Sequence, residues 1–170
     1  MKVTSRERDT GWKDFQALVK SIKKDAHRIK VGVLDDGGAG SEVRDGGYSN
    51  AEIAAIHEFG SADGRIPERS FIRSTFEANR EKYQANLKTL LRQVLDGKQT
   101  IPNAFNLIGA RIAADIKKRV TTGAPIPPPN APAVAARKAR LGKNGGVVRT
   151  LVDTGRMIAS VTWAYLKGSQ

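Results

Sequence analysis

Apolar residues recur at steps of three and four in four segments of the chain, which is the pattern of helices with one buried face. The first segment lies near the N-terminus, where Asp9 or Thr10 can cap a helix. A short helix is expected over 51–59, a long one over 69–96 and another over 101–121. The apolar face of the N-terminal helix comprises Trp12, Phe15, Val19, Ile22 and Ala26. This face predicts that the N-terminal helix packs alongside the rest of the domain.

Cap and turn residues mark the ends of the three later helices. Asn50 is placed to cap the short helix, and Gly60 to end it. Thr100 or Ile101 holds the cap position of the last helix, just before Pro102. The two long helices are expected to end at Gly97 and Gly123. The inward positions are Ile53, Ile56 and Phe59, then Ile72, Phe76, Tyr83, Leu87, Leu90, Leu91 and Val94, and finally Phe105, Ile108, Ile112, Ile116 and Val120.

Two short segments rich in β-branched residues predict strands. The first spans 29–34 and runs into an Asp-Asp-Gly-Gly turn. The second spans 160–166 and alternates, so that Val161, Trp163 and Tyr165 share one face. The expected fold class is α+β, with a small, mostly antiparallel sheet packed against two long helices and an extended proline-rich arm or loop.

Two segments show neither the helical spacing nor the strand alternation of apolar residues. We expect both to be loops within a single domain spanning 1–170. Residues 35–49 form a glycine-rich acidic loop that we expect to be flexible. Residues 124–146 form a basic arm or loop that holds five prolines and a small helix over 133–141. Segments of this kind seldom pack within their own domain. We therefore expect the arm to order against a neighbouring subunit.

The composition is that of an ordinary globular chain with an uneven charge. Its 170 residues are 39% hydrophobic and include no cysteine, which excludes disulfides, thiolate metal ligands and a cysteine nucleophile. The net charge is +12. Residues 31–66 carry two positive and seven negative charges, whereas residues 101–146 carry eight positive and one negative. Such blocks suit a protein that docks on copies of itself or lies near a polyanion. No secretory signal and no membrane-spanning segment are expected.

No arrangement of residues predicts catalysis. The His57-Glu58 pair lacks the second histidine of a zinc-protease helix, and the acidic loop fits neither a calcium loop nor a P-loop. Asp35 and Asp36 form an acidic pair, but no downstream Glu-x-Lys completes a nuclease metal site. We interpret His27 and His57 as structural or surface residues. The expectation is a protein without catalytic residues, metal or cofactor, which is not an enzyme.

Two parts of the chain resemble signatures of tailed-bacteriophage neck and tail-completion proteins, a group that includes minor tail protein Z-like and phage virion morphogenesis proteins. The first part is AEIAAIHEFG at 51–60 with RIPERSFIR at 65–73, and the second is the stretch 128–138 followed by LVDTGRMIASV at 151–161. The resemblance spans about residues 29–167, and the chain departs from it at 35–49 and 125–129. The signature residues are Ile56, His57, Glu58, Phe59, Gly60, Pro67, Arg69, Phe71, Asp153, Thr154, Gly155 and Ser160.

The resemblance implies a structural virion protein of the head–tail junction, assembled in the host cytoplasm. Such a protein forms a ring around the DNA channel and joins the tail to the head, with a hexamer favoured and a dodecamer as the alternative. The implied partners are further copies of the chain, neighbouring neck and tail proteins, and DNA that passes without sequence-specific contact; no membrane is implied. The signature residues are turns, caps and anchors, such as Gly60, Pro67 and Phe71, which suits a scaffold.

Basic residues in the second half of the chain are candidates for a DNA channel or for a subunit interface. Lys117, Lys118 and Arg119 end the last long helix, where cations also complement the helix dipole. The arm adds Arg137, Lys138, Arg140 and Lys143. These residues keep a second hypothesis open, a basic non-specific nucleic-acid-binding protein that acts as a monomer or dimer. A metal-dependent nuclease is a third and weaker hypothesis.

Overall fold

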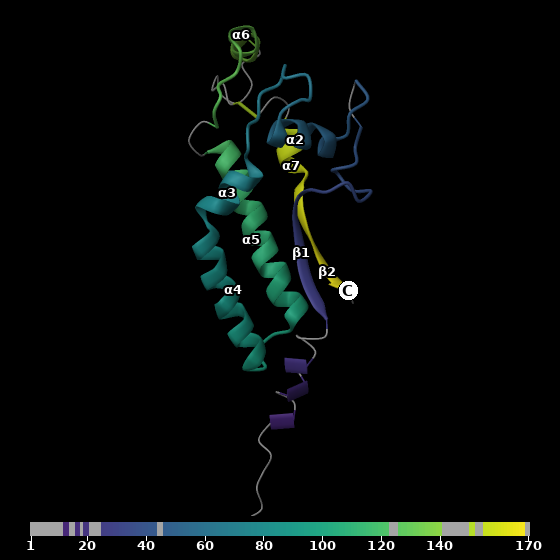
Figure 1. Ribbon diagram of the computed structural model, residues 1–170, viewed down its shortest axis with the longest axis vertical. Coiled ribbons are helices and arrows are strands. Elements are labelled where there is room, and N and C mark those ends of the chain that lie inside the picture. The colour runs from purple at the N-terminus through teal and green to yellow at the C-terminus, as the bar shows by residue number, and fades with distance from the viewer. Residues whose placement is uncertain are drawn as a thin grey trace, which may run out of the picture.

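The computed structural model describes residues 12–13, 16–17, 19–20, 25–43, 46–122, 126–140, 150–151 and 155–168. Its elements, in chain order, are β1 (Ala26–Val33), α2 (Asn50–Phe59), α3 (Ile72–Ala78), α4 (Arg80–Leu95), α5 (Ile101–Thr121), α6 (Pro132–Arg140), α7 (Arg156–Ala159) and β2 (Val161–Gly168). They form an elongated body in which α4 and α5 run beside the two strands (Figure 1). The expected α+β class is confirmed.

Strands β1 and β2 pair antiparallel along their whole length, in a register that sets Val31 opposite Trp163. Both expected strands are therefore present, with shifted ends. The first begins at Ala26, which the helical spacing had assigned to the N-terminal helix, and the second reaches Gly168. Among the described residues the sheet has these two strands alone. Because a two-stranded ribbon is barely stable by itself, its stability depends on the helices that cover it.

Helix α5 covers the sheet, and Gly109 allows the close approach. A Cβ atom at this position would lie 2.2 Å from Cδ1 of Ile29 and 2.7 Å from the nearest ring atom of Trp163. The indole of Trp163 also donates to Oδ1 of Asn106 at 3.3 Å. Tyr165 lies on the same face of β2 and bonds through its hydroxyl to Nδ1 of His27 at 2.7 Å. The face of β2 that carries Trp163 and Tyr165, which the alternation predicted, is thus the face that packs on α5.

The helical stripe of α5 forms the centre of the core, as its spacing predicts. Thr100 caps the helix by accepting from the backbone N–H of Asn103. The buried apolar side chains of the stripe are Ile108, Ile112, Ile116 and Val120, with Phe105 partly buried. The helix extends to Thr121, and the expected stop at Gly123 lies outside the described residues. Among the described residues, no helix is long and apolar enough to cross a bilayer.

The long helix expected over 69–96 is two helices. Helix α3 ends at Ala78, and α4 begins at Arg80, with Asn79 between them at a ψ angle of 11°. The side-chain amide of Asn79 donates to the carbonyl of Thr75 at 2.9 Å and so bonds to a backbone acceptor of the preceding turn. Asparagine competes for backbone groups in this way more readily than the residues on either side. Phe76, which we expected in the core, lies on α3 before this break and is 40% exposed.

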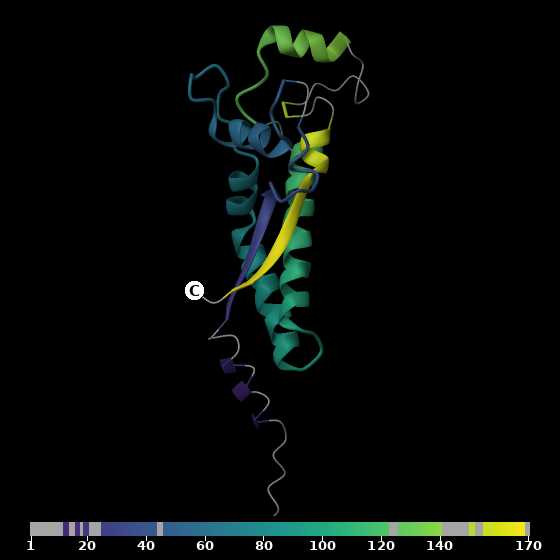
Figure 2. The same cartoon turned by 90° about the vertical axis from the view of Figure 1, so that its right-hand side faces the viewer.

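The N-terminal segment does not show the packed face that its spacing predicts. Residues 12–13, 16–17 and 19–20 are helical, but Trp12 is 62% exposed. These pieces lie beyond the lower end of β1 and away from the helices of the body (Figures 1 and 2). Phe15 and Ile22 lie outside the described residues. The expected packing alongside the domain is therefore wrong for the part that the structure describes.

Helix α2 lies across the upper end of the body, next to the acidic loop. Its cap is Ser49 rather than the expected Asn50, because Ser49 and Glu52 form a capping box: each side chain accepts from the other residue's backbone N–H. Asn50 is instead buried and donates to the carbonyl of Ala39 at 2.8 Å. Ala51 N–H also bonds to the carbonyl of Gly40 at 2.9 Å. The loop that we expected to be flexible is thus tied to the first turn of the helix.

Candidate interaction site

Glu58 joins α2 to α3 through a buried carboxylate. The residue is 5% exposed, and its oxygens accept the backbone N–H groups of Phe71, Ile72 and Arg73, each at 2.9 Å. The hydroxyl of Ser70 donates a fourth bond at 2.7 Å. The first N–H groups of a helix have no partner within it and carry partial positive charge. A carboxylate from another helix therefore satisfies the start of α3 and fixes the angle between the two elements.

Arg69 joins the same region to the proline-rich segment. Its Nε and Nη2 groups donate to the carbonyls of Pro128 and Pro129 at 2.9 and 3.0 Å. Its own backbone N–H donates to the carbonyl of His57 at 2.7 Å. The side chain is buried, and this burial lowers the pKa of Arg69. A guanidinium that bonds two successive carbonyls holds an otherwise hydrogen-bond-poor segment against the body.

The other signature residues also serve the fold where the structure describes them. Phe71 is fully buried, and Gly60 has a φ of 83° that glycine alone adopts readily. A Cβ at Gly60 would lie 3.2 Å from the backbone of Ile66 and Glu68. Phe59 is 68% exposed, so its predicted inward position is wrong, while Ile56 is partly buried. Pro67 is exposed in the extended lead-in to α3.

The C-terminal signature has the same structural character. Gly155 stands before α7 with a left-handed φ of 78°, as expected for a residue that permits a tight backbone turn. Ser160 is buried and donates to the carbonyl of Met157 at 2.8 Å. Asp153 and Thr154, which we expected to cap this turn, lie outside the described residues.

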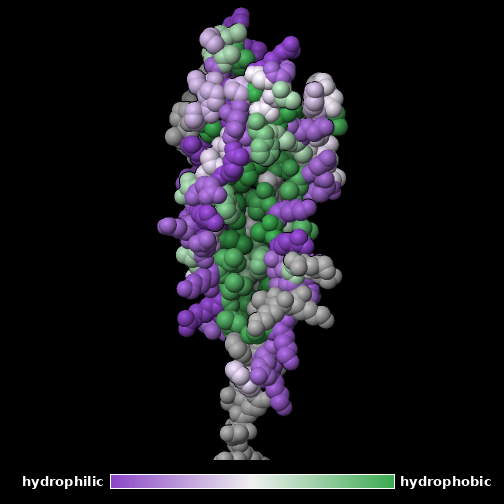
Figure 3. All heavy atoms as spheres, in the orientation of Figure 1, coloured by the Kyte–Doolittle hydropathy of each residue, from purple (hydrophilic) through white to green (hydrophobic). Residues whose placement is uncertain are grey.

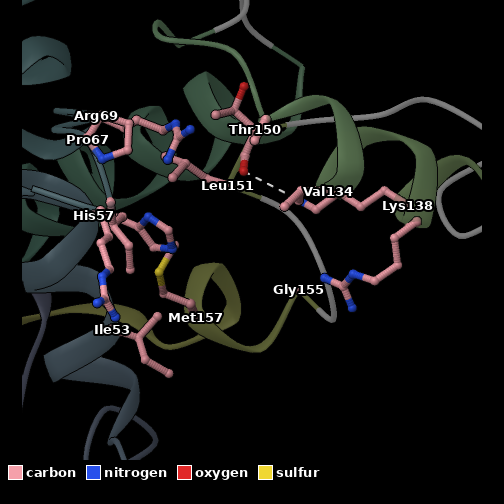
Figure 4. A pocket seen from close by; sticks show the side chains of 14 residues that line it. Ile53, His57, Pro67, Arg69, Val134, Lys138, Thr150, Leu151, Gly155 and Met157 are labelled. Atoms are coloured by element: carbon pink, nitrogen blue, oxygen red, sulfur yellow. Dashed lines mark hydrogen bonds between the residues drawn. The ribbon is translucent and has the colours of Figure 1, made fainter. Parts of the chain in front are cut away.

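A cavity of about 330 Å³ opens between α2, the start of α7 and α6 (Figure 4). Its described lining includes the basic side chains of Arg65, Arg69, Arg137 and Lys138, together with His57, and no acidic residue. Lys138 reaches across it and donates to the carbonyl of Thr150 at 3.2 Å, the bond drawn in Figure 4. The cavity therefore offers a positive environment that suits carboxylate or phosphate groups.

An apolar groove of about 530 Å³ lies on the other side of α2, beside the edge of β1 that faces away from β2. Val31, Val33, Ile72 and Ile112 contribute to its walls. At its rim lies the exposed ring of Phe59, with the guanidinium of Arg73 5.9 Å from the ring centre. Figure 3 shows the band of apolar side chains that runs down this face. Surfaces of this kind are characteristic of protein contacts.

The basic residues expected at a channel or interface gather at one end of the molecule. Lys117, Lys118 and Arg119 end α5, and the first and third are partly buried while Lys118 is exposed. Arg137, Lys138 and Arg140 form the last turn of α6. Both helices reach the upper end of the body in Figure 1. Lys143 lies outside the described residues.

A second charged cluster links α4 to α5 on the flank of the body. Asp115 accepts from Nζ of Lys82 at 2.9 Å and lies 3.6 Å from Nε of Arg111. Burial alone would raise the pKa of Asp115, but hydrogen bonding and attraction to Lys82, with Tyr83 and Arg111, hold that pKa below its ordinary value. Burial, together with the Asp115 charge, raises the pKa of Tyr83 well above its ordinary value. The arrangement is an interhelical ion pair and a tyrosine that stays neutral.

Within the described ranges, no group of three or more histidine, cysteine, aspartate or glutamate residues is placed to hold a metal ion. What the sequence did not predict is which residues hydrogen-bond to one another; no reactive group was missed among the described residues. The capping box is visible as Ser-x-x-Glu at 49–52, and we placed the cap one residue too late. The bonds of Glu58 to α3 and of Arg69 to the prolines join positions 12 to 60 residues apart. No local pattern reveals bonds of that range.

Comparisons of the chain with protein-family models, curated proteins and solved structures found no match. A proposal for its function therefore depends on its own residues and their geometry.

Proposed function

We propose that this chain is a structural subunit of the head–tail junction of a tailed bacteriophage, where copies form a ring around the DNA channel and join the tail to the head. The observation that carries the proposal is the structural role of the residues in the phage-like signature at 56–71. Two charged residues of this signature, Glu58 and Arg69, use their side chains in hydrogen bonds that hold α2, α3 and the proline-rich segment together. A signature built of such bonds fits a part whose task is to keep a shape.

Self-association is supported by the apolar groove beside β1. An unpaired strand edge next to exposed apolar side chains invites contact with another chain. Phe59 and Phe76, which line the groove, are 68% and 40% exposed. Subunits that assemble into a ring need two different surfaces that fit each other, because each copy contacts one neighbour on either side. We assign the groove to one of these contacts.

Contact with DNA is supported by the charge at the upper end of the body. Lys117, Lys118 and Arg119 lie on the last turns of α5, at the upper end of the body in Figure 1, and Asp115 is the one acidic residue of that helix. Lysine and arginine bind phosphates without regard to base sequence. Such contacts suit a duplex that must slide through a channel.

Sedimentation velocity and negative-stain images of the purified chain test the proposal. We expect a closed ring with a central hole at micromolar concentration. Phe59→Ser should weaken its assembly without unfolding the subunit, because the ring of Phe59 is exposed at the groove. Leu95→Ser is the matched control, since Leu95 is 45% exposed at the distant end of α4. A chain that stays monomeric at all concentrations, and that binds duplex DNA as a monomer, would favour the nucleic-acid-binding alternative.

A further inference from the structure

We propose that the basic surface of α6, made of Arg137, Lys138 and Arg140 above the cavity, binds the acidic loop of a second copy of this chain, residues 35–42 with Asp35, Asp36 and Glu42. The proposal rests on the proposed self-association and names two different surfaces of the subunit that fit each other, beside the contact at the apolar groove. Each surface is described below from its own contacts.

Helix α6 is a projecting element with no buried residue. Its nine residues include Val134, which is 37% exposed. Helices this short are marginal in water by themselves. The bonds from Arg69 to Pro128 and Pro129 hold the segment leading into the helix, and Lys138 ties its last turn to Thr150. An element that is fixed at these points and whose side chains are mostly exposed offers a surface to a partner.

The chemistry beneath α6 selects an acidic occupant. Arg69 is buried in the wall of the cavity, and among the described residues its guanidinium bonds carbonyls and forms no ion pair. Arg137 lines the same cavity, as does Arg65, which pairs with the exposed Asp63 at 3.3 Å, and the described walls themselves contain no acidic side chain. A buried cation whose charge is met by dipoles alone gains from the approach of a carboxylate.

The acidic loop presents the complementary charges in a fixed arrangement. Asp35, Asp36 and Glu42 are exposed, and none forms an ion pair within the described part of the chain. The loop backbone is bonded to α2, since Asn50 N–H donates to the carbonyl of Glu42 at 3.1 Å and its side chain to Ala39. A loop that is already ordered loses little conformational entropy when it binds.

Both surfaces also carry apolar side chains that a contact would bury. Val43 and Tyr48 beside the acidic loop are 68% and 55% exposed. Val134 on α6 and Ile66 at the cavity are 37% and 36% exposed. An interface that combines apolar anchors with opposite charges gains affinity from the first and orientation from the second.

The two surfaces are placed for contact between copies. Both lie at the upper end of the body, with α6 at its extremity and the loop on one side below it (Figures 1 and 2). A contact between two different surfaces at about the same height can repeat around an axis along the body, and it forms a ring where the rotation between successive copies closes. The nearby acidic loop also disfavours DNA as the occupant of α6, because it would repel a polyanion bound there.

Charge reversal on each surface in turn tests the proposal. The first variant carries Arg137→Glu and Arg140→Glu, and the second carries Asp35→Lys and Asp36→Lys; all four positions are exposed, so both variants should fold. Alone, each places like charges against each other in every contact, and we expect the midpoint concentration for assembly to rise at least about tenfold. Mixed in equal amounts, the variants have complementary surfaces again and should regain the wild-type mass with the two forms alternating.

The control variant carries Lys88→Glu and Arg92→Glu, which makes the same change of charge on the exposed face of α4 and should assemble as the wild type does. Sedimentation velocity gives the mass and native mass spectrometry the composition. Assembly of either reversed variant alone at the wild-type concentration overturns this interface while leaving the ring intact. The interface is also overturned if the mixture fails to recover while both variants stay folded, or if the first variant loses only duplex DNA binding. A wild type that stays monomeric at all concentrations overturns the interface, and it overturns the proposed function as well where it also binds duplex DNA as a monomer.

Discussion

The Oε2 atom of Glu58 lies 2.9 Å from the backbone nitrogen of Phe71, a residue thirteen positions later whose ring is fully buried. The same carboxylate accepts the next two N–H groups of the chain. One side chain of α2 thereby sets where α3 begins and how Phe71 enters the core. The order of polar and aromatic residues in this stretch has a structural explanation, because these residues form the junction between two helices.

Loss of the Glu58 carboxylate should destabilise the fold strongly. Glu58→Ala leaves buried N–H groups without acceptors, and we expect it to lower the free energy of unfolding by about 2–4 kcal/mol. Glu58→Gln keeps one acceptor oxygen and should cost roughly half as much. Glu68→Gln is the control, because Glu68 is exposed and pairs with Arg73 at the surface, so its loss should cost less than about 1 kcal/mol. Urea unfolding measures all three, and equal effects at positions 58 and 68 would refute the junction.

Replacing Gly109 with alanine should also destabilise the fold, although alanine favours helices. The added Cβ would enter the space held by Ile29 and Trp163. We expect Gly109→Ala to cost about 1–3 kcal/mol by overpacking, and Ile29→Val in the same chain to recover part of it. Ala114 is exposed on the same helix, so Ala114→Gly should instead cost about 1 kcal/mol through helix propensity alone. Thermal unfolding that shows Gly109→Ala to be stabilising would contradict the close packing of α5 on the sheet.

The Asp115 ion pair should give the stability a dependence on acid pH. The folded pKa of Asp115 lies below the value of about 3.9 expected for the unfolded chain. Its contribution is therefore fully present above that value and is lost as the pH falls through the folded pKa. Because Lys82 is 40% exposed, we expect less than about 1 kcal/mol.

Asp115→Asn removes this titration and provides the comparison. The difference in unfolding free energy between wild type and Asp115→Asn should be constant from pH 5 to 7 and shrink towards zero below about pH 4. Guanidinium is unsuitable for the measurement because it screens charge, so urea titrations at fixed ionic strength are appropriate. A difference that grows as the pH falls would mean that Asp115 is unfavourably ionised in the fold.

How much of this structure was predictable depended on the range of the interactions involved. The helix expected over about 101–121 is present with these bounds, because its stripe from Ile108 to Val120 and Thr100, one of its two cap candidates, are local signals. The break at Asn79 was missed because the apolar spacing continues across it. The spacing of apolar residues cannot predict a single hydrogen bond from the Asn79 side chain to the carbonyl of Thr75. The N-terminal face around Trp12 was expected to pack, but amphipathic spacing does not say which molecule the apolar face contacts.

The candidate site divides in the same way. The signature residues of 56–71 were identified from their types and order, and Gly60 was correctly placed in a sharp turn. The cavity that unites His57, Arg65 and Lys138 could not be predicted, because α6 reaches it only through the bonds between Arg69 and the prolines. Nothing in the local sequence of α6 specifies where that helix lies.

Neutralising the end of α5 should weaken contact with DNA. In titrations with duplex DNA, the logarithm of the binding constant falls linearly with the logarithm of the salt concentration. The slope of this line steepens by roughly 0.9 for each phosphate contact. Lys117→Gln, Lys118→Gln and Arg119→Gln together should flatten this slope, by up to about three such steps, and leave the assembled mass unchanged. Lys88→Gln with Arg92→Gln on α4 is the control and should leave the slope as it is. If the triple variant breaks the assembly and the wild-type slope is near zero, these residues serve subunit contacts instead.

The central claim, that this chain builds the ring that joins tail to head, is tested most directly by cryo-EM of particles formed with and without it. With the chain present, we predict a ring of its copies at the head–tail junction, with DNA in the central channel. Without it, heads filled with DNA and complete tails should accumulate separately. Normal joined particles in its absence, or mature particles that contain no copy of the chain, would contradict the account.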